Sequence, residues 1–463
     1  MWGLEEIELK KSPFYRFVHE KDMDFFFVND LGKRILTDKV GQSVWEALPG
    51  SGDEICEKVR ETHLISKRLV YEFLYVFCCA GIIESKKLFE PKQSPESVKE
   101  FSEPKNRDLV SVIIVTHNGR DFISTCLKSI FWQSYQNLEV MCVDNHSTDE
   151  TVSFIKDHFP KVHITALKKN RHYAQGINKG LQRARGRYVL VLNQDTELDP
   201  DCVQLLVKKA QSVPEAGAVV PMMKFARLRD FINGIGNQVN NHSWGTDNFI
   251  YCVDIGQFQE LKEVPSACFG AVLLKRDAVE EVGFVDSGYG SFYEDVDWSF
   301  RCWFQGWKVV PEPQAVVYHE FGGSYPEGIK LFFAVRNRLR LVLKLFCGRV
   351  KLGFLKNYIL EDIRCVLSFV KSRQGRKIWI YVRAYLSLLC HLPGIAVKRW
   401  NVMRTKAKGM REKTILQKNP SFYCCLNASL EMPEIDTPVI RRYYRRHLLN
   451  KERDKGQIKE TCT

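Results

Sequence analysis

The stretch VLVLNQDTELDP, residues 189–200, passes directly from an apolar run into a cluster of carboxylates and amides. Val189 to Leu192 form the short apolar run, which is typical of a strand buried on both faces. Two explanations fit the polar residues that follow. Asn and Asp side chains form turns where strands reach the surface. Alternatively, the carboxyl end of a parallel strand in an open α/β sheet holds a ligand.

The segments around this stretch alternate between strand and helix patterns. A buried strand is predicted at 111–118, further strands at 138–145, 162–169 and 188–195, and helices at 121–133, 149–159 and 174–184. Strand–helix repeats of this kind connect through right-handed crossovers into a mostly parallel, doubly wound sheet. The predicted fold class is therefore α/β.

Three of the predicted strands end in polar clusters. Thr116 to Asn118 follow the first strand, Asp144 and Asn145 the second, and Asn193 to Asp195 the fourth. Because parallel strands bring their carboxyl ends to one edge of the sheet, these clusters are expected where open sheets bind nucleotides. The ligand explanation is therefore favoured over the turn.

Composition divides the 463 residues into four regions. Residues 1–90 are predicted to form a small α+β domain, and residues 91–107 a linker rich in Pro, Ser and charge. The α/β domain covers 108–345, and 346–463 is helical, basic and amphipathic. From Cys347 onward there are 25 Lys and Arg against nine Asp and Glu, so the net charge of +13 arises in this last region.

The cysteine pattern and the N-terminus predict a cytoplasmic protein. The 15 cysteines form no CxxC pair and no zinc-type spacing, which indicates reduced thiols. The N-terminal MWGLEEIELKK lacks the apolar stretch of an export signal. No run reaches the roughly 18 apolar residues of a spanning helix. The nearest, 384–397, is interrupted by His391 and Pro393.

Common nucleotide-binding and hydrolase motifs are absent, since no GxGxxG follows the first strand and neither a P-loop nor GxSxG occurs. Instead, eight pieces in order resemble glycosyltransferase family 2, most closely its rhamnosyltransferase branch. They are SVIIVTHN, LEVMCVDNHSTDET, NRHYAQGINKG, ARGRYVLVLNQD, FGAVLLKRDAVEEVGFVD, FYEDVDW, VVYHEFG and AVRNRLRL. The resemblance implies the GT-A fold and inverting transfer of a sugar from a nucleoside-diphosphate donor (dTDP-rhamnose or a UDP-sugar) to a glycan or lipid-linked glycan.

The resemblance also implies a set of donor contacts. Asp144 matches the family aspartate that hydrogen-bonds the base, with Thr116 as its companion. The implied nucleotide-sugar-binding residues are Thr116, Asn118, Asp144, Asn170, Asn178, Asn193 and Arg336. Structural alternatives are turn formation for Asp144, capping for Asn170 and Asn178, and a solvated helix charge for Arg336.

Two residues match the family's metal site. Asp195 corresponds to the last acid of the DxD-type motif that binds Mg²⁺ or Mn²⁺, and His319 to a histidine that reaches the metal or the diphosphate. Asn193 replaces the first acid, so the metal prediction rests on Asp195. One carboxylate is sufficient because Mg²⁺ keeps water and substrate phosphates as further ligands. A turn or helix cap is the alternative for Asp195, and a structural role for His319.

Asp295 matches the family's catalytic base, with Glu294 as the fallback. A base is required because the acceptor hydroxyl must lose its proton. Aromatic neighbours such as Trp298 are expected to raise the pKa of Asp295. The alternative is that these carboxylates only stabilise a helix N-terminus through its dipole.

The sequence departs from the family pattern in two loops. His146 and His172 stand where the family commonly has Gly. The loops on the nucleotide side are therefore expected to be shaped differently.

The regions before and after the α/β domain are compatible with more than one class of acceptor. NDLGKRILTDKVGQSVWEAL and AGIIES resemble the PqqD-like winged-helix fold, which grips peptides, so a peptide acceptor is an alternative to a glycan. The basic C-terminal helices predict contact with a membrane surface. No nucleic-acid module accompanies the charge, so no nucleic-acid partner is expected. A third class, a non-catalytic peptide- or DNA-binding adaptor, is disfavoured by the presence of Asp144, Asp195 and Asp295.

Overall fold

The computed structural model consists of two compact units. One contains Met1–Ser102, Cys252–Gly256 and Ser421–Thr463, and the other contains Glu103–Tyr251 and Gln257–Pro420. In the first unit the structure describes residues 8–11, 15–19, 25–29, 34–37, 39–62, 74, 83–84 and 254. In the second it describes residues 108–226, 228–239, 245–250, 258–320, 326–406 and 415.

The described part of the first unit combines small antiparallel sheets with two helices. One sheet contains β2 (Tyr15–His19), β3 (Phe25–Asn29) and β4 (Arg34–Thr37), and the other β1 (Glu8–Lys11), β5 (Gly50–Ser51) and β6 (Ile83–Glu84). The helices are α1 (Lys39–Glu46) and α2 (Gly52–Thr62). Apart from Leu74, the segment 63–82 that leads into β6 lies outside the described residues, so the PqqD-like fold stays a prediction.

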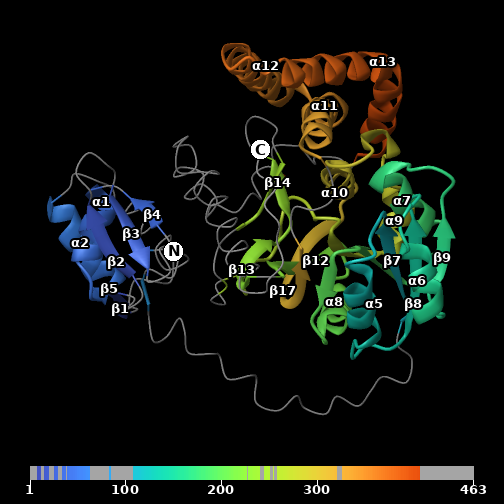
Figure 1. Cartoon of the computed structure of the whole chain (residues 1–463), viewed down its shortest axis with the longest axis horizontal. Helices are drawn as coiled ribbons and strands as arrows, with labels where there is room; N and C mark the ends of the chain where they lie inside the picture. The colour runs from blue at the N-terminus through green and yellow to red at the C-terminus, as the bar shows by residue number, and fades with distance from the viewer. Residues whose placement is uncertain are drawn as a thin grey trace. The chain divides into compact units, whose positions relative to one another are not determined.

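A nine-stranded sheet organises the second unit (Figure 1). Its order is β11-β17-β12-β16-β10-β7-β8-β9, with β13 beside β12. The bounds are β7 (Val110–Thr116), β8 (Leu138–Asp144), β9 (His163–Ala166), β10 (Tyr188–Asn193), β11 (Thr196–Leu198), β12 (Ala216–Phe225), β13 (Leu228–Gly234), β16 (Ala271–Lys275) and β17 (Lys308–His319).

Parallel pairing joins β10, β7, β8 and β9, and also β12 and β17. The antiparallel strands β16, β11 and β13 complete the sheet. The predicted α/β class is confirmed, and the four predicted strands are β7 to β10. A separate two-stranded sheet is formed by β14 (Asn237–Val239) and β15 (Gly245–Asp247).

Helices cover both faces of the sheet. The first face carries α7 (His172–Leu181), α9 (Arg276–Val282) and α10 (Glu294–Phe304), and the second α5 (Ile123–Phe131), α6 (Thr151–His158) and α8 (Cys202–Ser212). Successive strand residues alternate between the two cores, so Ile113 packs in the first and Val112 in the second. The central strands β7 and β10 are largely apolar and buried because both faces are covered, whereas the edge strand β9 is partly exposed.

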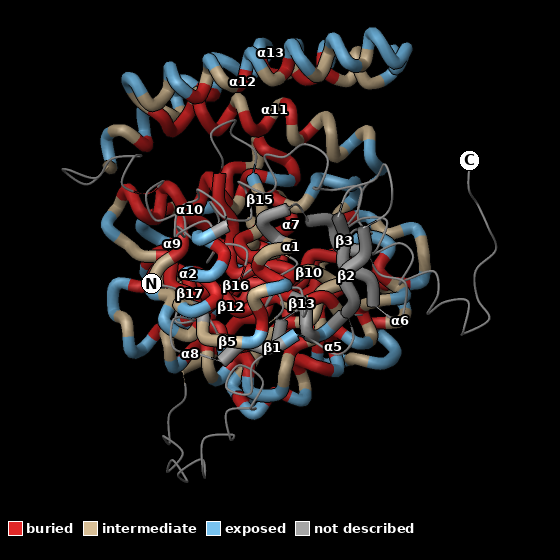
Figure 2. Tube along the Cα trace, turned by 90° about the vertical axis from the view of Figure 1, so that its left-hand side faces the viewer, coloured by how far each residue is buried: buried red, intermediate tan, exposed pale blue. Residues whose placement is uncertain are grey.

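Three long helices, α11 (Glu327–Leu345), α12 (Gly348–Lys371) and α13 (Gly375–Thr405), belong to the same compact unit. Figures 1 and 2 both show α12 and α13 on the side of α11 that faces away from the sheet. A buried ion pair between Arg338 and Asp362 joins α11 to α12, and the Tyr385 hydroxyl of α13 donates to the same carboxylate at 2.7 Å. The basic region is thus packed onto the α/β domain as far as the structure describes it.

Helix α13 is long and apolar enough to cross a membrane by length and composition alone. The sequence predicted no such helix, because His391 and Pro393 interrupt the apolar run. The structure continues the helix through both residues. One face of α13 packs on the protein through Tyr381, Ala384 and Leu388.

Candidate active site

The residues of the expected metal site meet where β10, β11 and β17 end. Register places His319, the last residue of β17, opposite Thr196 of β11, directly beside Asp195. The His319 Nε2 atom lies 3.5 Å from Asp195 Oδ1 and 3.5 Å from Asn193 Nδ2. The structure therefore brings Asn193, Asp195 and His319 together.

The orientation of His319 is set by Asn233 of β13. Its Nδ1 atom lies 2.8 Å from Asn233 Oδ1. Because an amide oxygen only accepts, the neutral imidazole carries its proton at Nδ1 and presents the Nε2 lone pair to Asp195. The Asp195 Oδ1 atom is buried and accepts no hydrogen bond from the described residues. Two electron-rich atoms facing each other require a proton or a cation between them.

This donor set fits a divalent cation, with one carboxylate and one imidazole whose second nitrogen is anchored. In the described part of the chain, no group of three or more His, Cys, Asp and Glu could enclose a metal ion. The remaining ligands would then be substrate phosphates and water, as is usual for Mg²⁺. The alternative of a helix cap does not apply to Asp195, since α8 begins later, after Asp201.

The expected catalytic carboxylates open helix α10. Asp295 is partly buried, and its carboxylate accepts hydrogen bonds from Asn237 Nδ2 and the Val296 N–H, both at 2.8 Å. Burial raises the pKa of Asp295 to about 6, against the opposing effect of these donors. Glu294 is buried with Oε2 lacking a partner, and burial and the Asp295 charge raise its pKa well above the usual range.

The neighbouring residues Phe269 and Gly270 link the metal-site residues to the α10 carboxylates. The Asn193 N–H donates to the Gly270 carbonyl at 2.9 Å, and the Phe269 N–H donates to the Asp295 carboxylate. The Tyr173 hydroxyl donates to the Phe269 carbonyl at 2.7 Å. Burial raises the pKa of Tyr173, and the charges of Glu294, Asp195 and Asp295 raise it further.

Asp247 of β15 stands between the same two groups. Burial raises its pKa to about 7, with His319 lowering it and Asp295 raising it. Register places Asp247 opposite Asn237, the residue that donates to Asp295. The small β14–β15 sheet thus closes the site on one side.

The expected base-binding residues lie side by side on β7 and β8. Register pairs Thr116 with Asp144, and both are buried. The Thr116 hydroxyl donates to Gln194 Oε1 at 2.5 Å, and both Asp144 carboxylate oxygens accept from the Ser147 N–H at 3.2 Å. The turn role of Asp144 is therefore present, and its contact with a base stays a prediction.

The remaining donor candidates have local structural partners. Asn118 Oδ1 accepts from the Thr148 N–H at 2.8 Å, and Asn170 Oδ1 from the His172 N–H at 2.9 Å. The Asn178 amide exchanges two hydrogen bonds with the Val285 backbone, at 2.8 and 3.0 Å. The Asn178 contacts are not a helix cap, since Asn178 lies inside α7 and bonds the backbone of another segment. Direct donor contacts of the three residues stay predictions.

Arg336 and its neighbour Asn337 on α11 hold the loop that leads into α10. Arg336 Nη2 donates to the carbonyls of Gly288 and Tyr289 at 3.2 and 2.5 Å. Burial, with Arg340 nearby, lowers the pKa of Arg336 to about 10. Asn337 Nδ2 donates to three carbonyls at 2.8 to 3.0 Å, those of Tyr289, Ser291 and Phe292. Arg336 is thus engaged with backbone rather than solvated, and its contact with the diphosphate stays a prediction.

Three residues of this site were not singled out from the sequence: Tyr173, Asn237 and Asp247. Tyr173 lies within the quoted NRHYAQGINKG piece, where its position beside the expected donor loop was the available signal. Asn237 and Asp247 lie in short strands with no motif and no clear periodicity. Only their pairing in three dimensions brings them to Asp295 and His319.

Comparison with known families agrees with this geometry, because residues 111–283 match the family model described as Glycosyl transferase family 2. The chain carries a glycosyl transferase family 2 domain. The matched segment contains Asp144 and Asp195. The α10 carboxylates and His319 lie beyond its end, in the part of the domain placed by the structure.

Relatives of this glycosyl transferase family 2 domain include two bacterial enzymes. Poly-beta-1,6-N-acetyl-D-glucosamine synthase of Staphylococcus epidermidis is 24% identical over 71% of this chain and 76% of its own length. N-acetylglucosaminyl-diphospho-decaprenol L-rhamnosyltransferase of Mycobacterium tuberculosis is 24% identical over 46% of this chain and 76% of its own length. The first is named as a polysaccharide synthase and the second as a rhamnosyltransferase.

Two solved structures are also similar. GalNAc-T7 with UDP, GalNAc and Mn²⁺ has a TM-score of 0.44 at 18% identity, covering 54% of this chain and 50% of its own. The mannosyltransferase PcManGT of Pyrobaculum calidifontis, with GDP-Man and Mn²⁺, has a TM-score of 0.40 at 17% identity, covering 71% and 88%.

Proposed function

We propose that this chain is an inverting, metal-dependent glycosyltransferase. It moves a sugar from a nucleoside-diphosphate donor, dTDP-rhamnose or a UDP-sugar, to a hydroxyl of a glycan or lipid-linked glycan in surface polysaccharide biosynthesis. The observation that carries the proposal is a carboxylate of raised pKa, Asp295, in one site with the Asp195–His319 pair. The names of the two relatives, a polysaccharide synthase and a lipid-linked rhamnosyltransferase, support the acceptor class.

Asp295 acts as the base because its pKa is raised to about 6 and the residue is not fully buried. It takes the proton of the acceptor hydroxyl as that oxygen forms a bond to the anomeric carbon. The bond from this carbon to the donor diphosphate breaks, and its electron pair leaves with the nucleoside diphosphate. Attack from the opposite side inverts the anomeric centre. Burial and the neighbouring Asp295 charge raise the pKa of Glu294 well above its usual range, so we assign the role of base to Asp295.

The leaving diphosphate requires charge neutralisation at the sheet edge. Asp195 and His319 would hold the divalent cation that supplies it when bound. Tyr173 and Asp247 enclose the same space and exclude water from it. Thr116 and Asp144 lie on neighbouring strands of this edge, where the base of the donor is expected.

The first test is the Asp295→Asn variant. Sugar transfer is expected to fall by about 10² to 10⁴ fold, because the general base is removed while the shape is kept. Nucleoside-diphosphate binding, measured as a thermal shift with Mn²⁺, is expected to persist. The exposed Asp277→Asn change serves as the control and should keep full activity. Transfer by Asp295→Asn at the rate of the wild type would refute the assignment.

The donor is tested by thermal shift with UDP, dTDP and GDP, each with and without Mn²⁺. A ligand that binds only the native state raises the unfolding temperature, so one nucleotide is expected to stand out. The additional shift produced by Mn²⁺ is expected to disappear in Asp195→Asn. If no nucleotide stabilises the protein, the donor proposal is wrong whatever the acceptor is.

A further inference from the structure

Helix α13 has an exposed apolar stripe opposite its packed face. Four exposed side chains recur at spacings of three and four residues: Trp379 (58% exposed), Val382 (41%), Leu386 (53%) and Leu389 (57%). Residues at this spacing share one face of a helix. Because the opposite face is buried against the protein, the stripe is an additional apolar surface that no described segment covers.

Helix α12 has a matching stripe. Its exposed apolar side chains are Ile359 (51% exposed), Ile363 (51%), Leu367 (56%) and Val370 (56%). Figure 2 shows α12 and α13 together as the outer layer of this part of the molecule, with exposed residues along the side away from α11. Contiguous apolar surface of this kind marks an interaction site on a folded protein. We call the two stripes the α12–α13 face.

The charge around this face is almost entirely positive. Between Gly348 and Thr405 the acidic residues are Glu361 and Asp362, and Asp362 is already paired with Arg338. The exposed cations on the two helices and their connection are Arg349, Lys356, Arg364, Lys371, Arg373, Arg376, Arg383 and Arg404. An apolar stripe flanked by cations fits an anionic lipid surface, and a second apolar protein surface would leave the cations without a function.

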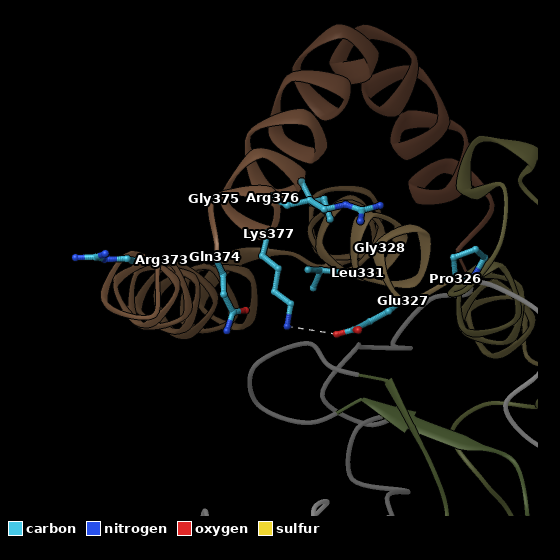
Figure 3. Close-up of a pocket in the computed structure, with 10 residues that line it drawn as sticks. Pro326, Glu327, Gly328, Leu331, Arg373, Gln374, Gly375, Arg376 and Lys377 are labelled. Carbon is cyan, nitrogen blue, oxygen red and sulfur yellow. Dashed lines mark ion pairs between the residues drawn. The ribbon is translucent and has the colours of Figure 1, made fainter. Parts of the chain in front are cut away.

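A cavity of about 530 Å³ lies at the edge of the α12–α13 face, between the first turns of α11 and α13. Its lining includes His172, Phe332, Phe333, Arg376, Trp379 and Arg383. A second cavity of about 480 Å³ shares Arg376 and adds Lys377. Figure 3 shows Lys377 directed to Glu327, with which it pairs at 3.3 Å, and Arg373 directed away from the cavity.

The larger cavity lies beside the proposed active site. His172, which lines it, directly precedes Tyr173, whose hydroxyl donates to the carbonyl of Phe269, the residue whose N–H donates to Asp295. Phe333, on the same wall, packs against Phe292 with ring centroids 6.4 Å apart, and Phe292 lies two residues before Glu294. A ligand held by Arg376 and Arg383 is therefore separated from the reacting groups by a short aromatic wall.

We propose that the α12–α13 face docks on an anionic membrane surface, with the cavity at Arg376 and Arg383 receiving a lipid phosphate. The apolar stripes enter the interfacial region and the flanking arginines contact phosphates. This arrangement places the active site next to the bilayer, where the head of a lipid-linked acceptor lies. The statement about the lipid-linked acceptor rests on the proposed function, whereas the statement that the α12–α13 face docks on an anionic membrane does not.

The test is flotation of the full chain with phosphatidylcholine vesicles, with and without phosphatidylglycerol, in the absence of any donor. Binding is expected only to the anionic vesicles and is expected to weaken as salt is added. Trp379→Glu and Leu386→Glu are each expected to weaken binding about tenfold or more, because each removes buried apolar area. Arg376→Gln and Arg383→Gln are each expected to weaken it about fivefold.

Trp132→Glu is the matched control. Trp132 is 75% exposed at the end of α5, so this variant changes a tryptophan that is more exposed than Trp379 and lies outside the α12–α13 face. It should bind vesicles like the wild type, and all variants should unfold at the wild-type temperature. The proposal is overturned if the wild type does not float, or if Trp379→Glu floats like Trp132→Glu. It is also overturned if light scattering shows a dimer that Trp379→Glu abolishes, since the face would then be covered by a second copy.

Vesicle binding and sugar transfer give separate readouts. If the protein binds anionic vesicles but turns over no nucleotide sugar, the membrane-docking proposal is supported and the proposed function is wrong. If it transfers sugar to a water-soluble acceptor but does not bind vesicles, the proposed function is supported and the membrane-docking proposal is wrong.

Discussion

Asp295 and Glu294 are neighbours in sequence, yet their surroundings give them different chemistry. Asp295 is partly exposed. Backbone N–H groups and the Asn237 side-chain amide donate to its carboxylate, which limits the rise of its pKa to about 6. Glu294 is buried with an unpartnered oxygen, so its pKa rises further. The sequence predicted a raised pKa from aromatic neighbours. Which of the two carboxyls has the higher pKa depends on burial, which the spacing of residues in the sequence does not specify.

The raised pKa of Asp295 predicts the pH dependence of the enzyme. The base must be ionised, so activity at saturating donor is expected to rise with pH through about 6 and to level off above it. The free energy of unfolding is expected to have the opposite pH dependence. The folded state holds a proton that the unfolded state loses between about pH 4 and pH 6, so the free energy of unfolding falls as pH rises through that interval.

Activity and urea unfolding, measured on the same preparation from pH 5 to 8, check both directions. Asp295→Asn removes the titrating group and should flatten this part of the stability profile. It is also expected to unfold at a slightly higher temperature at neutral pH, because the penalty of burying a charge is gone. An activity profile that is flat across pH 6 would rule out Asp295 as the base.

The two departures from the family pattern have a common conformational basis. His146 and His172 have φ angles of +69° and +63°, in the left-handed region where Gly has no steric penalty. Histidine here occupies a conformation that favours glycine, at some cost in strain. The expected difference in loop shape stays a prediction.

At the scale of elements, the start of α10 is the most strained part of the site. Phe292 and Tyr293 have consecutive φ angles of +66° and +70°, and the helix begins at the next residue. Two non-glycine residues in this region cost on the order of 1 to 3 kcal/mol each. The three hydrogen bonds from Asn337 to this loop hold it in place. Asn337 is therefore a positioning residue for Asp295.

The Asn337→Ala variant tests this role. We expect kcat to fall about tenfold or more while the donor KM stays unchanged, because the catalytic carboxylate of Asp295 is displaced and the donor-binding residues are not. The free energy of unfolding should also fall by roughly 2 kcal/mol, since buried carbonyls lose their donor. Steady-state kinetics and urea unfolding measure the two effects. Asn401→Ala, at an exposed position on α13, should change neither. A rise in KM alone would contradict the positioning role.

The elements differ in how far the sequence predicted them. β7, β8 and β10 are apolar runs that end in polar clusters, so their order and the sheet edge were foreseeable from periodicity. The start of α10 was foreseeable from its acidic first turn. β13, β14 and β15 carry Asn233, Asn237 and Asp247 on short segments without a repeating pattern. Their contribution depends on pairing between distant residues, which no local pattern encodes.

At the scale of the whole second unit, Asp286 ties the sheet domain to the basic helices. It accepts from Arg340 and Lys344 of α11 at 3.1 and 2.9 Å, and pairs with Lys398 of α13. Lys344, Arg340 and Lys398 hold the pKa of this buried carboxyl far below its usual range, against the opposing effect of burial. The sequence predicted two separate regions, since the charge shift near residue 346 marks composition and not packing.

Asp286→Asn is expected to lower the free energy of unfolding by about 3 kcal/mol, because it leaves the buried Arg340 without its carboxylate partner and removes one of the two partners of Lys344. The contribution of Asp286 is fully present above the ordinary Asp pKa near 3.8 and is lost as pH falls through the lowered folded value. Urea unfolding at neutral and acidic pH measures both. Asp277→Asn, whose side chain is 62% exposed, should change stability by less than about 1 kcal/mol. Equal losses in the two variants would show that the Asp286 cluster is not an anchor.

The core that supports α10 does not end with the sheet. Val402 and Ile415 pack in the same buried cluster as Val296 and Phe300. A premature stop codon anywhere in the basic region before these residues would therefore remove core side chains as well as a surface. Such a lesion in the gene should produce an unfolded, degraded chain, and its carrier would resemble a complete deletion.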